Sequence, residues 1–232
     1  MIKSALEKIV SEDLAEIWSI LDGEEKRRIL DNFQIHNFKK NQVIYAEKEE
    51  PEFIWCLIKG KVKKYKDGVG GRQQIIRLSR PVQYFGYRAY FANEPYVSSA
   101  AALEASTLGT LPMSLVEEVM EKNYKLARFF ITDLSQNLGG SDTKIVNLTQ
   151  KHIRGRLAEA LMLLKDNYGY EDDNSTLKIY LAREDLANLS NMTTSNAIRT
   201  LSGFVTEKLI TVDGRRIKII NEPMLRKISK HG

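Results

Sequence analysis

The sequence predicts an α+β chain: an N-terminal antiparallel β-barrel or jelly roll, a long dimerisation helix, and a C-terminal winged helix-turn-helix. Three observations support this order. Short apolar runs alternate with turn residues over 33–111, a long helical pattern starts at Asn123, and two short helices followed by a hairpin pattern occupy 181–219. We therefore divide the chain into 1–122, 123–150 and 151–232.

The composition is that of a globular protein. The chain has 232 residues, enough for two domains, of which 43% are hydrophobic and 28% are charged. No apolar run reaches the roughly 18 residues that a bilayer-spanning helix needs, and the first residues are charged and amphipathic, unlike a secretion signal. We expect a cytoplasmic protein without a membrane partner.

Few residues suit metal binding or catalysis. The single cysteine, Cys56, excludes an internal disulfide and a cysteine-rich metal site, and its apolar neighbours favour a buried thiol. The three histidines are widely spaced, so a haem or metal site built on one of them is an alternative that no motif supports. Gly68–Gly71 is typical of a hairpin turn, because no helix start follows it as a phosphate loop requires. We expect no catalytic residues, no metal, no cofactor and no enzymatic activity.

The N-terminal part begins with helices and continues as short strands. Leu6–Leu30 has a helical pattern with a break at Asp22 and Gly23. Beyond about Phe33, short apolar runs are separated by glycine, aspartate and proline, which is typical of an antiparallel barrel. The predicted strand regions are Gln42–Tyr45, Phe53–Ile58, Lys61–Tyr65, Gln73–Leu78 and Ser98–Leu111.

The long helix follows a short one at Ser114–Lys122, and its apolar positions alternate steps of four and three. This heptad seam persists for over three heptads, more than one surface helix needs, and it predicts a homodimer. The alternative is packing onto the chain's own barrel. Gly139 and Gly140 interrupt the pattern at about 1 kcal/mol each relative to alanine, and they would permit a close helix approach or a bend. The seam comprises Ala127, Ile131, Leu134, Leu138, Ser141, Ile145, Leu148 and His152.

The C-terminal part contains a helix-turn-helix pattern. An apolar helix at Leu157–Leu164 is followed, after a polar loop, by a short helix at Ala182–Leu189. The next turn contains Asn191, and asparagine is, after glycine, the residue that best tolerates a positive φ. A second helix then begins on Thr193 or Thr194, either of which can accept a backbone N–H as an N-cap.

The exposed face of this second helix carries short polar side chains and one arginine. Such a face suits the major groove, because small hydroxyl and amide groups allow close approach and arginine can bond a guanine edge. A merely solvated surface is the alternative. Strand patterns then flank Asp213 and Gly214, a strong hairpin signal. The candidate DNA-contacting residues are Thr193, Thr194, Ser195, Asn196 and Arg199 on the helix and Arg215 and Arg216 after the hairpin turn.

The charge distribution favours a nucleic-acid partner for the C-terminal part. Residues 151–232 hold 14 Lys and Arg against 10 Asp and Glu, whereas residues 1–150 hold 21 against 20. Attraction to phosphates supplies most nonspecific DNA affinity, so this local excess supports double-stranded DNA as the partner.

Five short segments are the most specific features of the chain: Ile58–Lys63, Phe85–Arg88, Arg156–Ala158, Arg183–Ala187 and Ile198–Leu201. Together with the order of the parts, these segments resemble the CRP/FNR family of bacterial transcription regulators over nearly the whole chain. The resemblance implies a cyclic-nucleotide-binding-like barrel, a homodimer, control of transcription, and RNA polymerase as a partner. It does not extend to iron–sulfur oxygen sensing, because the N-terminal region lacks the cysteines that this branch needs.

The resemblance also bears on the effector. Family members bind cyclic nucleotide through a Phe-Gly-Glu-like segment and, further along, an arginine that pairs with the phosphate. Here Tyr87 occupies the glutamate position, and Tyr96 or Val97 occupies the arginine position. A buried phosphate without a charged partner is costly, so cAMP and cGMP are not the expected effectors. We expect an unidentified small-molecule effector in a pocket that includes Phe85, Gly86, Tyr87, Arg88, Tyr96 and Val97.

In the second helix of the helix-turn-helix, the resemblance assigns base contacts to Thr194, Ser195, Ile198 and Arg199. Arg199 is retained as a guanine reader, whereas Ser195 stands where better-known members carry glutamate, so the operator should differ from theirs. We predict a homodimeric, sequence-specific transcription regulator. The alternative is a small-molecule-binding module whose helix-turn-helix mediates protein contacts.

Overall fold

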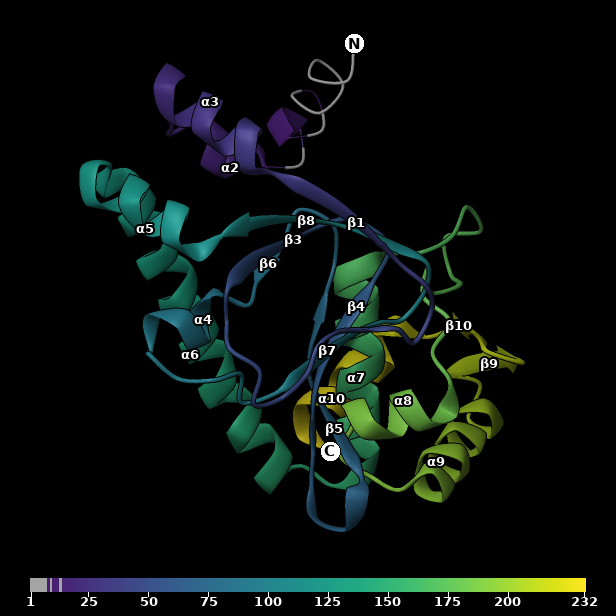
Figure 1. Ribbon diagram of the computed structural model, residues 1–232. Coiled ribbons are helices and arrows are strands. Elements are labelled where there is room, and N and C mark those ends of the chain that lie inside the picture. Colours follow the sequence, from purple (N-terminus) through teal and green to yellow (C-terminus); the bar gives the residue numbers. More distant parts are fainter. Residues whose placement is uncertain (1–7, 9, 13) are drawn as a thin grey trace. The chain divides into compact units, whose positions relative to one another are not determined.

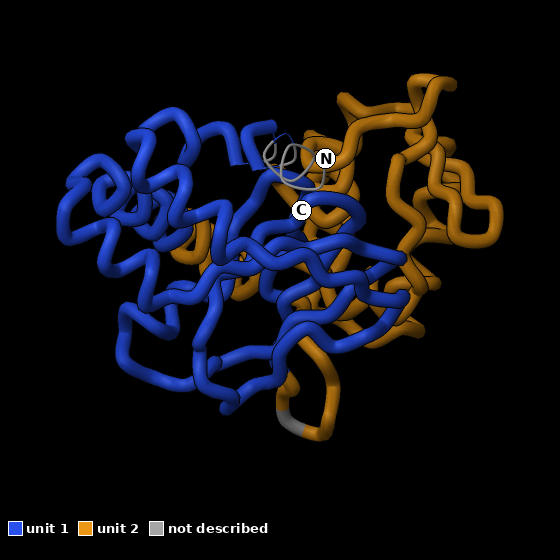
Figure 2. Tube along the Cα trace, turned by 45° about the horizontal axis from the view of Figure 1, so that its top comes forward, with its two compact units in different colours: residues 1–66, 76–139 blue, residues 67–75, 140–232 orange. Residues whose placement is uncertain are grey.

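The computed structural model describes residues 8, 10–12 and 14–232, and most of its elements are labelled in Figure 1. The chain divides into two compact units, residues 1–66 with 76–139 and residues 67–75 with 140–232 (Figure 2). The elements are α2 (Ala15–Trp18), α3 (Gly23–Asn32), β1 (Gln34–Phe38), β2 (Val43–Tyr45), β3 (Phe53–Lys59), β4 (Val62–Asp67), β5 (Gln73–Ser79), β6 (Tyr84–Phe85), α4 (Tyr87–Phe91), β7 (Ser99–Ala102), β8 (Ser106–Pro112), α5 (Met113–Lys122), α6 (Tyr124–Gln150), α7 (Ile153–Tyr168), α8 (Arg183–Leu189), α9 (Thr194–Thr206), β9 (Ile210–Asp213), β10 (Arg216–Ile219) and α10 (Glu222–His231).

The first unit is built on two four-stranded sheets, in the orders β1-β8-β3-β6 and β2-β7-β4-β5. Antiparallel pairing sets Ile54 of β3 opposite Leu111 of β8, and Val62 of β4 opposite Ala102 of β7. Side chains from both sheets meet in one buried cluster, which confirms the predicted antiparallel barrel. We call this cluster the barrel interior; it contains Tyr45, Leu57, Val62, Phe85, Ala89, Tyr96, Ala100 and Leu108.

A second buried cluster lies on the other face of β3. Strand residues alternate between faces, so Ile54 and Cys56 point away from the barrel interior and pack with helical side chains. These include Ile29 of α3, Val116 of α5 and Phe130 of α6. Cys56 is buried among them, as its apolar neighbours predicted.

The strands differ from the predicted ones in two places. The predicted strand Ser98–Leu111 is two strands, β7 and β8, which are separated by residues 103–105. The sequence pattern conceals this break because no glycine or proline marks it. Strands β1 and β6 were not predicted, because β1 has the mostly polar sequence Gln-Ile-His-Asn-Phe and β6 has only two residues.

The N-terminal helices agree with the predicted break at Asp22 and Gly23. The Asp22 side chain accepts hydrogen bonds from the backbone N–H groups of Glu24 and Glu25, and Glu25 bonds back to the Asp22 N–H. This capping box fixes where α3 begins. The predicted helical region begins at Leu6, which lies outside the described residues.

Helix α6 is one continuous helix of 27 residues and remains helical through Gly139 and Gly140. Three members of the predicted seam, Ile131, Leu138 and Ile145, are 63%, 65% and 61% exposed. A fourth member, Leu134, is partly buried and packs against the second buried cluster, so at this position the alternative of packing onto the chain's own barrel holds. His152 is not part of the seam, because α6 ends at Gln150 and His152 is instead the extended N-cap residue of α7. None of the helices in the described part of the chain is long and apolar enough to cross a membrane.

The second unit contains α7 to α10 and the two-stranded sheet β9-β10. Its buried side chains come from each of these elements and include Leu161, Leu186, Phe204 and Leu225. The predicted hairpin is confirmed, because Asp213 pairs with Arg216 across the turn. Helix α10 was not predicted. Asn221 caps it by accepting a hydrogen bond from the Met224 N–H at 3.0 Å.

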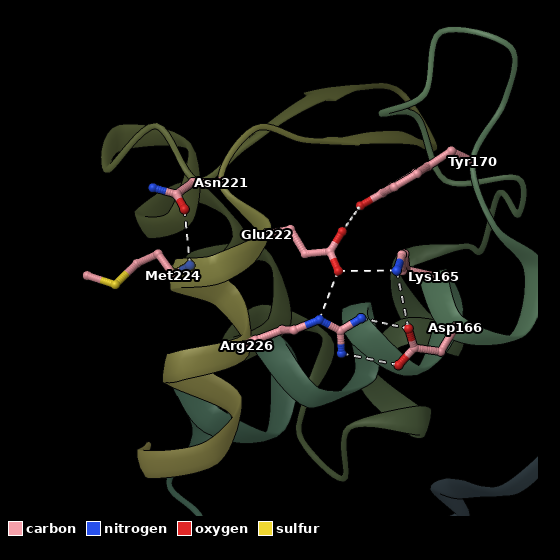
Figure 3. Close-up of polar contacts among 7 residues, drawn as sticks. All are labelled: Lys165, Asp166, Tyr170, Asn221, Glu222, Met224 and Arg226. Carbon is pink, nitrogen blue, oxygen red and sulfur yellow. Dashed lines mark hydrogen bonds and ion pairs between the residues drawn. The ribbon is translucent and has the colours of Figure 1, made fainter.

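A polar network joins α10 to the end of α7 and the loop that follows (Figure 3). Glu222 accepts hydrogen bonds of 2.8 Å from the Tyr170 hydroxyl and from Arg226 Nε. Lys165 lies 3.2 Å from Glu222, and Arg226 bonds Asp166 at 2.7 Å. The hydrogen bond from Tyr170 is the main reason that the pKa of Glu222 lies below its usual value.

We expect Glu222→Gln to lower the free energy of unfolding by about 1 kcal/mol at pH 7, because it weakens two charge-assisted hydrogen bonds and removes an ion pair. The folded-state pKa of Glu222 is lowered, so its contribution is present above the unfolded pKa and disappears as the pH falls through the folded pKa. Urea denaturation at pH 7 and pH 3.5 measures the difference. Asp172→Asn, in an exposed loop, is the control. An equal loss at both pH values would contradict this role.

Candidate nucleic-acid interface

Helices α8 and α9 form a tight helix-turn-helix. Asn191 in the turn has a φ of 51°, the left-handed conformation that its residue type predicted. Thr193 is the N-cap of α9, and its hydroxyl accepts a hydrogen bond from the Asn196 N–H at 3.3 Å. Leu201 and Phe204 are buried and fix the inner face of α9. The turn and this buried face together decide which side chains of α9 reach solvent.

The backbone of the turn is held by Arg156 of α7. Its Nε donates to the Ser190 carbonyl and its Nη2 to the Asn191 carbonyl, both at 3.1 Å. Its Nη1 reaches the carbonyls of Leu148 and Lys151 at 3.4 and 3.2 Å. The sequence analysis assigned no role to Arg156. An arginine in an apolar helix can nevertheless indicate that nearby backbone carbonyls need a hydrogen-bond donor.

The exposed face of α9 has the composition that the sequence predicted. Thr194, Ser195 and Arg199 are exposed, Ile198 is 48% exposed and Asn196 is partly buried. The Arg199 guanidinium donates one hydrogen bond to the Asn196 side chain at 2.6 Å. A guanidinium has five N–H donors in a planar fork, so Arg199 retains donors for a base edge.

A hydrogen bond from Arg183 connects α8 to the hairpin, and the sequence did not predict this contact. Arg183 donates to the Gly214 carbonyl at 2.5 Å, and Gly214 has a φ of 54° at the tip of the turn. Arg215 is exposed next to it. Arg216 lies over the Tyr180 ring, 5.5 Å from its centroid, so the two arginines of the wing have different surroundings.

Several cations near α9 are not neutralised by carboxylates. Arg154 pairs with Glu207, and this hydrogen bond is the main reason that the pKa of Glu207 is lowered. By contrast, Arg199, Lys208 and Arg215 contact no carboxylate within the described residues. These three positive charges are therefore available to attract phosphates.

Two of the predicted pocket residues, Phe85 and Tyr96, lie together in the barrel interior. Tyr96 stacks on Tyr45 with a centroid distance of 3.8 Å, and burial is the main cause that raises the pKa of Tyr96 to about 12. Gly86 beside them has a φ of 95°, and a Cβ there would lie 2.9 Å from the Trp55 ring. The glycine is thus required by both its conformation and its close neighbours.

The other predicted pocket residues have different surroundings. Tyr87 belongs to the cluster on the outer face of β3, not to the barrel interior. Arg88 pairs with Glu94 at 2.6 Å, although its positive charge also acts on Tyr45 of the barrel interior, and Val97 is 42% exposed. The sequence alone could not separate these positions, because consecutive residues at a strand-to-helix junction point in different directions.

A chain of hydrogen bonds connects Tyr87 to α6 and on to β5. The Tyr87 hydroxyl donates to the Asp133 carboxylate, which also accepts a bond from Asn137 at 2.7 Å. Arg77 of β5 in turn donates to the Asn137 side-chain oxygen. Burial is the main cause that raises the pKa of Asp133. These residues join the barrel to the first half of α6 within the first unit.

We expect Arg156→Met to lower the free energy of unfolding by about 3 kcal/mol, because it leaves the turn carbonyls without their donor. Amide hydrogen exchange at residues 190–192 should accelerate as well. Arg215→Met, an exposed arginine on the wing, is the control and should change stability by less than about 0.5 kcal/mol. Equal stability of the two variants would contradict the role assigned to Arg156.

Two family models match separate parts of this chain. The model of the cyclic nucleotide-binding domain matches residues 35–123, and the model of the Crp-like helix-turn-helix domain matches residues 155–228. Together they cover more than half of the chain, and they coincide with the barrel and with the module around α8 and α9.

Similar proteins are regulators. The chain is 25% identical over 182 residues to the regulatory protein HlyX of Actinobacillus pleuropneumoniae, covering 78% of this chain and 75% of that protein. It is 23% identical over 192 residues to the fumarate and nitrate reduction regulatory protein of Vibrio cholerae, covering 82% and 76%. The structure of FixK2 from Bradyrhizobium japonicum has the same fold, with a TM-score of 0.76 at 21% identity over 84% of this chain and 96% of that one. The chain belongs to the CRP/FNR family of DNA-binding transcription regulators.

Proposed function

We propose that the protein is a homodimeric regulator that reads a palindromic operator with α9 and responds to a small molecule through its barrel. This proposal rests on two surfaces that are exposed in one chain. One is the face of α9 that carries Arg199 and short polar side chains, and the other is the row of apolar side chains of α6 formed by Ile131, Leu138 and Ile145. In this proposal, residues 1–122 sense the effector, residues 123–150 form the dimer, and residues 151–232 bind DNA.

The dimer proposal rests on the spacing and exposure of the seam. Ile131, Leu138 and Ile145 are seven residues apart and each is more than 60% exposed. A row of large apolar side chains is rarely left in water. The same row from a second copy would cover it by knobs-into-holes packing. Two copies of α9 related by a two-fold axis would then read half-sites one DNA turn, about 34 Å, apart.

Base reading would come from the first turns of α9. Arg199 would bond guanine, and Ser195 would contact bases less selectively than a glutamate. The hydroxyl of Thr193 is engaged in capping, so Thr193 would contribute chiefly through the helix N-terminus, whose N–H groups favour phosphate. Thr194 and Asn196 would line the groove, and Arg215 and Arg216 would attract backbone phosphates.

The effector would not be cAMP or cGMP. At the position of the family's ribose-binding glutamate, Tyr87 points to Asp133 instead of the barrel interior. The candidates for the phosphate-binding position, Tyr96 and Val97, carry no charge. In the DNA-bound state the regulator would act on RNA polymerase, as the family resemblance implies.

Selection of bound sequences from a random DNA pool at about physiological salt tests the proposal, because nonspecific binding is weak there. We expect a palindrome with guanine in each half-site. Arg199→Ala should cost about 1–3 kcal/mol and relax the preference at one base pair per half-site. Lys227→Ala removes the same charge from an exposed position of α10 and should leave the preference intact.

Two results would count against this proposal. An unchanged base preference in Arg199→Ala would show that Arg199 of α9 does not read a base pair. A wild-type chain that enriches no sequence, with or without added cell extract to supply an effector, would favour a helix-turn-helix that mediates protein contacts.

We expect Leu138→Glu to convert the dimer into a monomer, because it would bury two carboxylates in the centre of the seam. Sedimentation equilibrium measures the mass directly. Gln136→Glu introduces the same charge at an exposed position of α6 outside the seam and should leave the dimer intact. A monomeric wild-type chain, or a Leu138→Glu dimer of unchanged affinity, would refute the α6 interface.

A further inference from the structure

Lys64 of β4 faces the barrel interior. Alternate residues of a strand share a face, and Val62, two positions earlier, belongs to the barrel interior. The residue opposite Lys64 on β7 is Ala100, which also belongs to it. Directly opposed residues of an antiparallel pair share a face as well. Both relations place the Lys64 side chain on the same side as the stacked pair Tyr45 and Tyr96.

The charged groups near Lys64 are cations. Burial is the main cause that lowers the pKa of Lys64 to about 8, and the positive charges of Arg77 and Arg88 contribute to the same shift. Arg77 has its own partners on α6. It donates a hydrogen bond to the Asn137 side-chain oxygen, and it is attracted by the negative charge of Asp133. Arg88 is paired with Glu94. Lys64 is therefore the member of this group of three cations that lacks a polar partner among the described residues.

An unpaired, partly buried ammonium group is unfavourable unless a charge or hydrogen-bond acceptor meets it. The surroundings offer aromatic and alanine side chains, and no carboxylate contacts the ammonium in the part of the chain described. We propose that Lys64 pairs with the anionic group, a carboxylate or a phosphate, of a small effector bound in the barrel interior. The role of this anion as the effector rests on the proposed function, whereas its binding to Lys64 does not.

The residue that binds the anion would therefore lie on β4. The family resemblance, by contrast, places the phosphate-binding arginine at Tyr96 or Val97. An anion at Lys64 would also be attracted by Arg77 and Arg88, whose positive charges act on Lys64. Arg77 bonds Asn137, so a change of charge at Lys64 would act on a residue that already contacts α6. This gives a direct route from the bound anion to the helix that carries the seam.

The test is the titration of Lys64 in the full-length protein by NMR, with lysine labelled at Cε. The Lys64 signal is assigned by its loss in Lys64→Met. Titrations are run in sodium chloride alone and with inorganic phosphate or succinate at matched ionic strength, which separates the two anion classes. Lys63→Met, at the neighbouring position on the opposite face of β4, is the control and should retain the Lys64 signal and its response.

We expect the pKa of Lys64 to be near 8 in chloride and to rise by about one unit or more with at least one probe, because an anion favours the protonated amine. A Lys64 pKa near the unperturbed value of about 10.4 in chloride would overturn the proposal. A pKa that neither phosphate nor succinate changes would overturn it as well.

The regulatory role is tested separately by measuring affinity for a selected operator with and without the bound probe. An unchanged affinity would overturn the role of the anion as effector while the Lys64 site stands. Failure to bind any DNA would overturn the proposed function and would leave the NMR titration unaffected. The two failures are therefore distinguishable.

Discussion

The helix-turn-helix depends on the hydrogen bonds that radiate from the Arg156 guanidinium. Apolar packing holds α9 against its neighbours, but it is not directional and does not specify the path of the turn. Arg156 supplies that direction by bonding the carbonyls of Ser190 and Asn191. It bonds the end of α6 through Leu148 with the same group. Arg156 thereby holds the turn that, together with the Thr193 cap and the buried face of α9, determines which side chains α9 exposes.

Helix α6 carries two different faces over its first half. Asp133 and Asn137 are four residues apart, share a face, and bond residues of the barrel. Ile131 and Leu138 are seven residues apart and are exposed. A ligand that changed the charge in the barrel interior would therefore act on one face of α6, while the proposed dimer would form on another. Gly139 and Gly140 do not break the helix, so the helix is continuous across this region.

The sequence predicted the architecture because its strongest patterns are local. Helical spacing, Asn191 in the turn and the Asp213-Gly214 hairpin each depend on a few neighbouring residues. It did not predict α10, whose position depends on contacts with α7 that are distant in sequence, such as the Arg226 bond to Asp166. It grouped Tyr87 with Tyr96, although the two side chains lie in different buried clusters. The sequence did not single out Lys64, because a lysine in a strand is normally solvated. That Lys64 faces the barrel interior follows from its pairing with Ala100 of β7.

We propose that two copies of the chain hold two copies of α9 at a fixed separation. The most direct measurement is the affinity for palindromes in which the distance between half-sites is increased one base pair at a time. We expect a sharp optimum of affinity with half-site centres about 10 base pairs apart. Affinity should fall strongly when about five base pairs are added, because the second half-site then faces the opposite side of the duplex. An affinity that is independent of this spacing would contradict it.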